Sequence, residues 1–199
     1  MSSSRNASRV FFQAVLRRPS LIGGVWPSSP ALAARLASVI PGSGDPVVVE
    51  LGAGSGAVSD GISARLGTRG RYLAVELDEE LAGHLRENYP HMEVLNANAT
   101  ELGKLLADRG VDAVDSVVSG LPWALIGEQG QREILGHVAE TLHPHGVFTT
   151  FAYVHALGMD NARRFRRLLE ATFDEVLLTR VVWANLPPAI TYVCRRPRR

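Results

Sequence analysis

Residues 47–57 read VVVELGAGSGA, a β-branched run that leads directly into three alternate glycines. Three successive valines are typical of a parallel strand that is covered on both faces. Gly52, Gly54 and Gly56 allow close backbone approach to a ligand where this strand turns into a helix. The stretch therefore predicts a nucleotide-like ligand at the first strand–helix turn of an α/β sheet.

The glycine spacing alone does not identify that ligand, because Gly52, Gly54 and Ala57 also fit the G-x-G-x-x-A pattern of dinucleotide-binding proteins. Glu50, at the end of the strand, separates the two classes. Its carboxylate would repel a pyrophosphate and attract a ligand ammonium group. The amides at the start of the following helix can meanwhile face a ligand carboxylate. This combination favours S-adenosylmethionine over a dinucleotide.

Strands and helices alternate along the rest of the chain, which predicts a mostly parallel sheet with ligands beyond the carboxyl ends of its strands. Two final strands, 174–183 and 189–195, flank Asn185, Leu186, Pro187 and Pro188 and predict a hairpin. The other expected strands cover 71–76, 92–95, 113–118 and 146–153, and the expected helices cover 57–66, 79–88, 100–108, 128–142 and 159–171.

The N-terminal segment predicts two further helices. Residues 5–17 place apolar side chains at helical spacing among arginines, so they predict a short basic amphipathic helix. Ser28 and Ser29 are candidate caps of a second helix that has Pro30 at its first position and runs to Ile40. We therefore expect a helical extension or lid over residues 1–44 and the ligand-binding domain over residues 45–199.

Composition limits the class of protein. The chain has 199 residues, 46% apolar and 21% charged, which predicts one packed soluble domain. Its single cysteine, Cys194, excludes an internal disulfide or a cysteine-rich zinc site, and no histidine cluster with supporting carboxylates predicts a metal. The low cysteine content fits a reducing compartment, so we expect a cytoplasmic location. The longest stretch without charged residues, 142–159, contains three histidines, so we expect no membrane span. The acid-poor, arginine- and serine-containing start would also fit a transit peptide.

Charge is distributed unevenly. Residues 1–44 contain five arginines and no acidic residue, and residues 195–199 contain four more arginines, whereas residues 45–194 hold 12 basic against 20 acidic residues. Basic ends on an acidic body suggest an anionic partner, either a lipid surface or nucleic acid; a solvated surface is the alternative.

Three later turns supply further candidate residues. Glu76, at the end of the second strand, can accept hydrogen bonds from both ribose hydroxyls, the alternative being a solvated turn acid. Asn98 can accept from an adenine amino group, or it can cap the next helix. The turn after the fourth strand, SGLPW at 119–123, lies where the cofactor methyl group should point. The expected cofactor-binding residues are Glu50, Gly52, Ala53, Gly54, Gly56, Glu76, Leu77, Asn98, Ala99 and Ser119.

These motifs together resemble the class I S-adenosylmethionine-dependent methyltransferases: ELGAGSG, VELD around Glu76, NANA and SGLPW. More narrowly, the chain is similar to the bacterial phospholipid N-methyltransferases through WPSS at 26–29, SGLPW, FAY at 151–153 and NLPPA at 185–189. The resemblance implies a Rossmann-like α/β fold with a seven-stranded, mostly parallel sheet, an antiparallel C-terminal hairpin and N-terminal helices. It also implies S-adenosylmethionine as cofactor, S-adenosylhomocysteine as product and an aminophospholipid headgroup as acceptor, with phosphatidylethanolamine converted towards phosphatidylcholine.

The related ribosomal RNA adenine dimethyltransferases read N-L-P-Y at the turn after strand four. Gly120 here removes the carboxamide that would hold a flipped adenine, which disfavours an RNA acceptor. Asn98 replaces the aspartate that is usual in both families. A soluble small-molecule acceptor, an RNA methyltransferase or RNA-binding protein, and a non-catalytic cofactor-binding protein remain alternatives.

The resemblance assigns the reaction to a few groups. Tyr153, or a water on the Ser119 and Gly120 carbonyls, could take the proton of an acceptor amine, and aromatic faces could hold a methylated ammonium, core packing being the alternative for each ring. The expected catalytic residues are Ser119, Gly120, Leu121, Pro122, Trp123 and Tyr153. The expected substrate-binding residues are Trp26, Ser28, Ser29, Trp123, Tyr153 and Asn185. Peripheral contact with an anionic membrane, on its inner face, is expected from Arg5, Arg9, Phe11, Phe12, Arg17 and Arg18, although this helix could equally cover the cofactor pocket.

Overall fold

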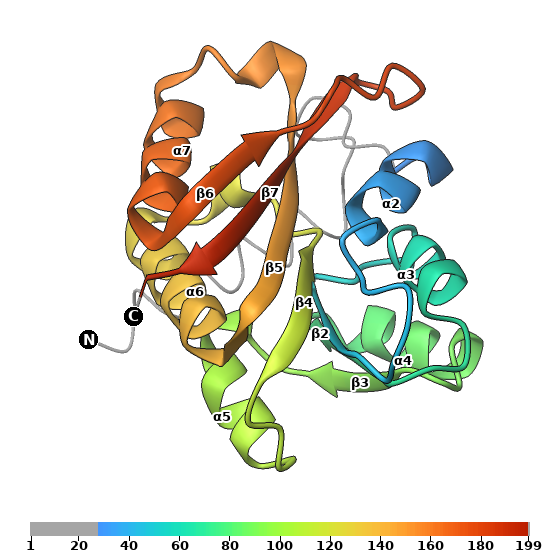
Figure 1. Cartoon of the computed structure of the whole chain (residues 1–199). Helices are drawn as coiled ribbons and strands as arrows, with labels where there is room; N and C mark the ends of the chain where they lie inside the picture. The colour runs from blue at the N-terminus through green and yellow to red at the C-terminus, as the bar shows by residue number, and fades with distance from the viewer. Residues whose placement is uncertain (1–27, 199) are drawn as a thin grey trace.

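The computed structural model describes residues 28–198, which form a twisted sheet covered by helices on both faces (Figure 1). The sheet has seven strands in the order β3-β2-β1-β4-β5-β7-β6. Strands β1 to β5 are parallel, and β7 is antiparallel to both β5 and β6. The predicted fold class is therefore confirmed. The strands are β1 (Val47–Leu51), β2 (Arg71–Glu76), β3 (Glu93–Asn96), β4 (Val114–Ser119), β5 (Leu142–Tyr153), β6 (Phe173–Leu178) and β7 (Ala189–Pro197).

Two groups of helices cover the sheet (Figure 1). One face packs against α2 (Pro30–Ala37), α3 (Ser59–Leu66) and α4 (Glu79–Asn88), and the other against α5 (Leu102–Ala107), α6 (Glu128–Thr141) and α7 (Asp160–Thr172). Short 3-10 helices span η2 (Ala99–Glu101), η3 (Trp123–Leu125) and η4 (Val154–Ala156). Within the described residues, no helix has the length and apolar character needed to cross a bilayer.

Strand β1 shows why the valine run specifies a central strand. Val48 and Val49 point to opposite faces, and both are fully buried. Val48 lies in the core with Leu36 of α2 and Ile62 of α3, whereas Val49 lies in the core with Leu102 of α5. The two apolar cores thus meet at β1, as the sequence predicts for a strand covered on both sides.

The start of α2 is also as predicted. Ser29 caps the helix, because its hydroxyl accepts from the Leu32 amide at 3.2 Å, and Pro30 occupies the first turn. The helix ends at Ala37, three residues earlier than predicted. Leu32 and Leu36 are fully buried in the core shared with β1 and α3, so α2 is part of the packed body of the molecule. The predicted helix at 5–17 lies outside the described residues.

The C-terminal strands pair as the predicted antiparallel hairpin, but their bounds differ from the predicted 174–183 and 189–195. Strand β6 ends at Leu178 because the Thr179 hydroxyl accepts from the Thr191 amide at 3.1 Å, replacing a regular ladder bond. Strand β5 begins at Leu142, where it pairs with Val114 before an irregular step in the register. Strand β7, the last in the chain, lies between β5 and β6 rather than at the sheet edge.

Candidate functional site

The carboxyl ends of β1, β2 and β4 bring the glycine loop (residues 52–56) against the SGLPW turn (residues 119–123). The Gly52 amide donates to the Val75 carbonyl at 2.8 Å, and the Gly120 amide donates to the Leu51 carbonyl at 2.9 Å. A Cβ at Gly120 would lie 2.7 Å from the Gly52 carbonyl oxygen. Residue 120 must therefore be glycine for these two turns to pack backbone to backbone.

Gly54 marks the open side of the glycine loop. Its φ of +58° lies in the left-handed region, and a Cβ built there would meet no atom within 4 Å. A side chain at this position would thus be disfavoured by backbone conformation and would also occupy the space beside the loop. The open space at Gly54 is compatible with the close ligand approach that the glycine pattern predicts.

Glu76 connects this loop to the end of β2. Its side chain is 1% exposed, which excludes the solvated turn acid as an alternative. One carboxylate oxygen accepts from the Gly54 amide at 2.8 Å and the other from the Asp78 amide at 2.9 Å. Burial raises the pKa of Glu76, although these backbone hydrogen bonds oppose the shift. Each oxygen retains a lone pair that could accept from a ligand hydroxyl.

Glu50 is fully buried, and only one of its two carboxylate oxygens is hydrogen-bonded. Its Oε2 accepts from the Ser59 hydroxyl at 2.7 Å and from the Tyr72 hydroxyl, whereas Oε1 has no hydrogen-bond partner. Desolvation raises the pKa of this carboxyl from 4.5 to about 7, despite the two hydroxyl donors. A buried acceptor without a donor is costly, so this oxygen favours a ligand that brings an N–H group.

Ser59 and Tyr72 are hydrogen-bond partners of Glu50 that the sequence reasoning missed. Because Glu50 pairs with Ala74 on β2, Tyr72 lies two residues away on the same face of the neighbouring strand. The signal in the sequence that could have identified Tyr72 is a tyrosine, an aromatic residue with a hydroxyl group, in the strand next to the one that carries Glu50.

The third loop is also fixed by side-chain amides. The Asn98 Oδ1 accepts from the Thr100 amide at 3.1 Å, so Asn98 caps η2, which is the second of the two roles considered for it. Asn96, which the sequence reasoning did not single out, donates to the Glu76 and Leu77 carbonyls at 3.0 and 3.1 Å. The Asn96 bonds join the end of β3 to the turn that follows β2, where Leu77 lies.

Trp123 faces the core. Its ring is 4% exposed, stacks on Phe165 with centroids 4.7 Å apart, and meets Phe148 edge-on. The indole N–H donates to the Ser119 hydroxyl at 3.1 Å and to the Thr150 hydroxyl at 3.0 Å. The geometry thus favours the core-packing alternative for this ring, which has no free face for a cation–π contact in this arrangement.

Three of the predicted acceptor-site residues, Tyr153, Asn185 and Ser29, lie near the end of β5. Tyr153, the last residue of β5, is partly buried between Phe151 and His155, and burial raises the pKa of its phenol. At neutral pH it is therefore a hydrogen-bonding group rather than a base. Asn185 is 2% exposed and accepts from the Ser29 amide at 2.9 Å. Ser28 immediately precedes this contact, and Trp26 lies outside the described residues.

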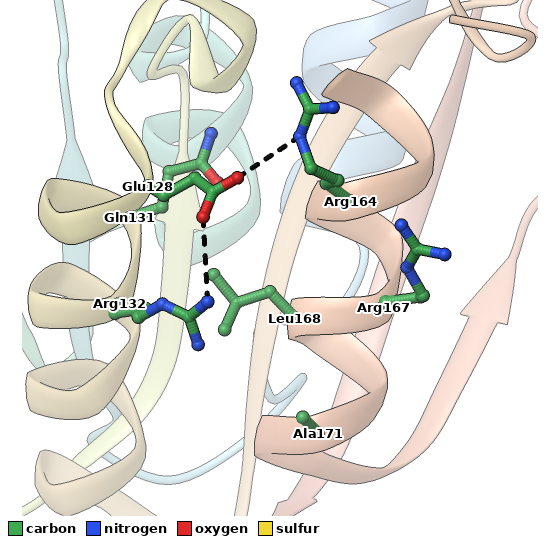
Figure 2. Close-up of a pocket in the computed structure, with 7 residues that line it drawn as sticks. All are labelled: Glu128, Gln131, Arg132, Arg164, Arg167, Leu168 and Ala171. Carbon is green, nitrogen blue, oxygen red and sulfur yellow. Dashed lines mark ion pairs between the residues drawn. The ribbon is translucent and has the colours of Figure 1, made fainter. Parts of the chain in front are cut away.

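A separate cavity of about 290 Å³ lies between α6 and α7 (Figure 2). Glu128 crosses it, pairing with Arg164 at 3.3 Å and with Arg132 at 3.7 Å. Its other lining residues are Gln131, Arg167, Leu168 and Ala171. None of them belongs to the glycine loop or to the strand ends, so we do not place this cavity in the site. Residues 28–198 hold no cluster of histidine, cysteine and carboxylate side chains suited to a metal ion.

Comparison with known proteins identifies the class. A family model described as a methyltransferase domain matches residues 48–146. The chain is 33% identical over 189 residues, covering 94% of each chain, to an ornithine lipid N-methyltransferase from Singulisphaera acidiphila.

Solved structures share the fold at low sequence identity. One is a TehB-like S-adenosylmethionine-dependent methyltransferase from Corynebacterium glutamicum, with a TM-score of 0.59, 14% identity, and coverage of 96% of this chain and 99% of that one. Another is human methyltransferase-like protein 13 in complex with S-adenosylhomocysteine, with a TM-score of 0.58, 18% identity, and coverage of 83% and 78%.

The residues at the strand ends fit S-adenosylmethionine. The unpartnered Glu50 oxygen suits an ammonium group, the open backbone at Gly54 leaves space beside the glycine loop, and Glu76 offers acceptors for ribose hydroxyls. These chemical requirements agree with the sequence and fold comparisons. The chain is a class I S-adenosylmethionine-dependent methyltransferase.

Proposed function

We propose that this enzyme transfers methyl groups to the amine nitrogen of a lipid headgroup. The observation that carries the proposal is the similarity to ornithine lipid N-methyltransferase, which extends over 94% of both chains rather than over the cofactor-binding half alone. The resemblance of WPSS and NLPPA to phospholipid N-methyltransferase motifs supports it, and the structure brings the two segments together, because the Ser29 amide donates to Asn185. Phosphatidylethanolamine, its partly methylated forms and ornithine lipid all present an amine of this class.

The residues of the chain suit such a transfer. Bound S-adenosylmethionine supplies a methyl group already activated by a sulfonium, so the protein has mainly to align a neutral amine with it. The proposed cofactor contacts are Glu50, the glycine loop and Glu76. Tyr153, protonated at neutral pH, can hydrogen-bond the amine or relay its proton to water, but it cannot store that proton. A water on the Ser119 and Gly120 carbonyls is the alternative proton acceptor, and the Ser119 carbonyl also accepts from the Thr150 hydroxyl at 3.2 Å.

An acceptor screen tests this proposal. The full chain is incubated with methyl-labelled S-adenosylmethionine and, separately, with vesicles containing phosphatidylethanolamine, vesicles containing ornithine lipid, total RNA and a soluble metabolite extract. We expect label in an aminolipid, and vesicles of phosphatidylcholine alone serve as the control. Label in RNA or in a soluble metabolite, with both aminolipids unlabelled, would overturn the lipid assignment.

We also propose that the basic segment 5–17, with the adjoining Arg18, contributes to reversible binding at the inner face of an anionic membrane. The contacts would be Arg5, Arg9, Phe11, Phe12, Arg17 and Arg18. Sedimentation with anionic vesicles compares the full chain with a variant that lacks residues 1–18. Equal binding by both proteins would remove this segment as an anchor.

A further inference from the structure

The loop between β6 and β7 carries the two most exposed large apolar side chains of the described residues. Trp183 is 76% exposed and Leu186 is 67% exposed, whereas most large apolar side chains in residues 28–198 are buried. Clustered apolar side chains on a soluble surface commonly mark a contact site. We call residues 179–188 the 179–188 loop.

This loop is held in a defined turn that directs both side chains outward. The Val182 amide donates to the Ala189 carbonyl at 2.7 Å, and the Asn185 amide donates to the Val182 carbonyl at 3.2 Å. Between the two exposed side chains, Asn185 is buried and its Nδ2 donates to the Pro187 carbonyl at 2.7 Å. The backbone around Trp183 and Leu186 is therefore fixed to the body of the protein.

The loop lies at the edge of the sheet that carries the cofactor residues. Its last neighbour, Ala189, pairs with Tyr153 at the carboxyl end of β5. Strands β1, β4 and β5 are parallel, so their carboxyl ends lie on the same side of the molecule. Figure 1 shows the loop projecting beyond β5, beside the start of α2. A surface that contacted its tip would face the edge from which an acceptor reaches the site.

The charge and chemistry of the loop fit a lipid surface. Arg180 is exposed at its base, and the sequence contains no aspartate or glutamate from Val176 to Arg199. Tryptophan combines a large apolar ring with one N–H donor, a combination that favours the headgroup layer of a bilayer. An apolar tip beside an arginine thus suits acyl chains and lipid phosphates together.

We propose that the 179–188 loop docks this enzyme on a lipid bilayer, with Trp183 and Leu186 in the headgroup layer and Arg180 facing lipid phosphates. The inference deepens the proposed function and rests on it, because an enzyme with a lipid acceptor must reach a bilayer. It places a membrane contact at the rim of the acceptor site, separate from the basic segment at residues 5–17.

Binding is measured with vesicles of phosphatidylcholine and phosphatidylglycerol, which contain no amine to methylate, and with the full chain. The double variant Trp183→Ala/Leu186→Ala is expected to bind about tenfold more weakly, because two apolar side chains no longer leave water. Leu177→Ala is the matched control: Leu177 is 52% exposed but lies within β6 rather than in the loop, so near-normal binding is expected. Equal losses in the double variant and in Leu177→Ala would point to general hydrophobicity and overturn the loop assignment.

Tryptophan fluorescence reads the insertion directly. Brominated phosphatidylcholine should quench a component of the wild-type emission that is absent from Trp183→Phe, a variant expected to keep most of the binding. No such component, or a double variant that binds as wild type does, would refute the docking role.

Two further measurements separate this inference from the proposed function. The affinity of the double variant for S-adenosylhomocysteine should equal that of the wild type, and a changed affinity would mean that the loop substitutions disturb the cofactor site. Loop-dependent vesicle binding without methylation of any aminolipid would reject the proposed acceptor and retain the docking surface.

Discussion

Replacing Glu50 by glutamine is expected to stabilise the ligand-free protein at alkaline pH relative to the wild type, while weakening its hold on the cofactor. Burial raises the pKa of Glu50 from 4.5 to about 7 in the folded state. The folded protein therefore binds this proton more tightly than the unfolded chain does. Wild-type stability from this group is greatest below pH 4.5, falls as the pH rises through the interval from 4.5 to 7, and is level above it. This pKa shift corresponds to a loss of about 3 kcal/mol in the free energy of unfolding across that interval.

Urea unfolding of both proteins at pH 5, 6, 7 and 8 tests this value. The difference in unfolding free energy, variant minus wild type, should rise with pH by up to about 3 kcal/mol, because glutamine has no charge to desolvate. Any constant offset from altered hydrogen bonds to Ser59 or Tyr72 cancels in that slope. A difference that is flat across this range would refute the assignment of a buried, perturbed carboxyl.

Two controls connect the effect to the site. Tyr72→Phe removes a hydrogen bond that lowers the pKa of Glu50, so the pH-dependent loss of stability should extend to higher pH. Calorimetry with S-adenosylhomocysteine, which carries the same ammonium group as the cofactor, should show weaker binding to Glu50→Gln by about 1 to 3 kcal/mol. Undiminished affinity would mean that the ammonium group binds elsewhere.

Three further substitutions test the strand ends. Glu76→Ala should weaken S-adenosylhomocysteine binding by about 1 to 3 kcal/mol, through lost acceptors and a loosened Gly54 amide, and calorimetry that finds no change would contradict the ribose placement. Gly120→Ala should lower the unfolding free energy by about 1 to 3 kcal/mol, because its Cβ meets the Gly52 carbonyl oxygen at 2.7 Å; wild-type stability in urea would show that the two turns separate freely. Trp123→Phe should cost about 1 to 3 kcal/mol of stability through its two lost hydrogen bonds while leaving kcat/KM for the acceptor nearly unchanged; a selective rise in KM without loss of stability would instead return the ring to the acceptor site.

Local patterns in the sequence predicted much of the fold because each depends on neighbouring residues. The valine run at 47–49 predicted a strand buried on both faces, and Ser29 with Pro30 predicted the start of α2. The antiparallel pairing of β6 with β7 was likewise predicted from the turn residues between them. In each case the deciding residues lie within a few positions of the feature.

Long-range contacts account for what the sequence did not predict. One of the two hydroxyls that bind Glu50 comes from Tyr72, 22 residues away on the next strand, so only the sheet register reveals it. The SGLPW turn contains no regular period from which to infer that the Trp123 ring points inward. The sequence similarly allowed two partners for the Asn98 oxygen, an adenine amino group or a backbone amide of the next helix. In the structure this oxygen accepts from the Thr100 amide of η2.

The position of β7 has a consequence for biosynthesis. Strand β5 and strand β6 both depend on β7 as a ladder partner, yet β7 comprises residues 189–197 of a 199-residue chain. During synthesis, one edge of β5 and the whole of β6 stay unpaired until residues 189–197 have been translated. Unpaired edges recruit other chains, so the nascent polypeptide should need chaperone protection until β7 is made, and a chain that stops before β7 should form inclusion bodies rather than a shortened enzyme.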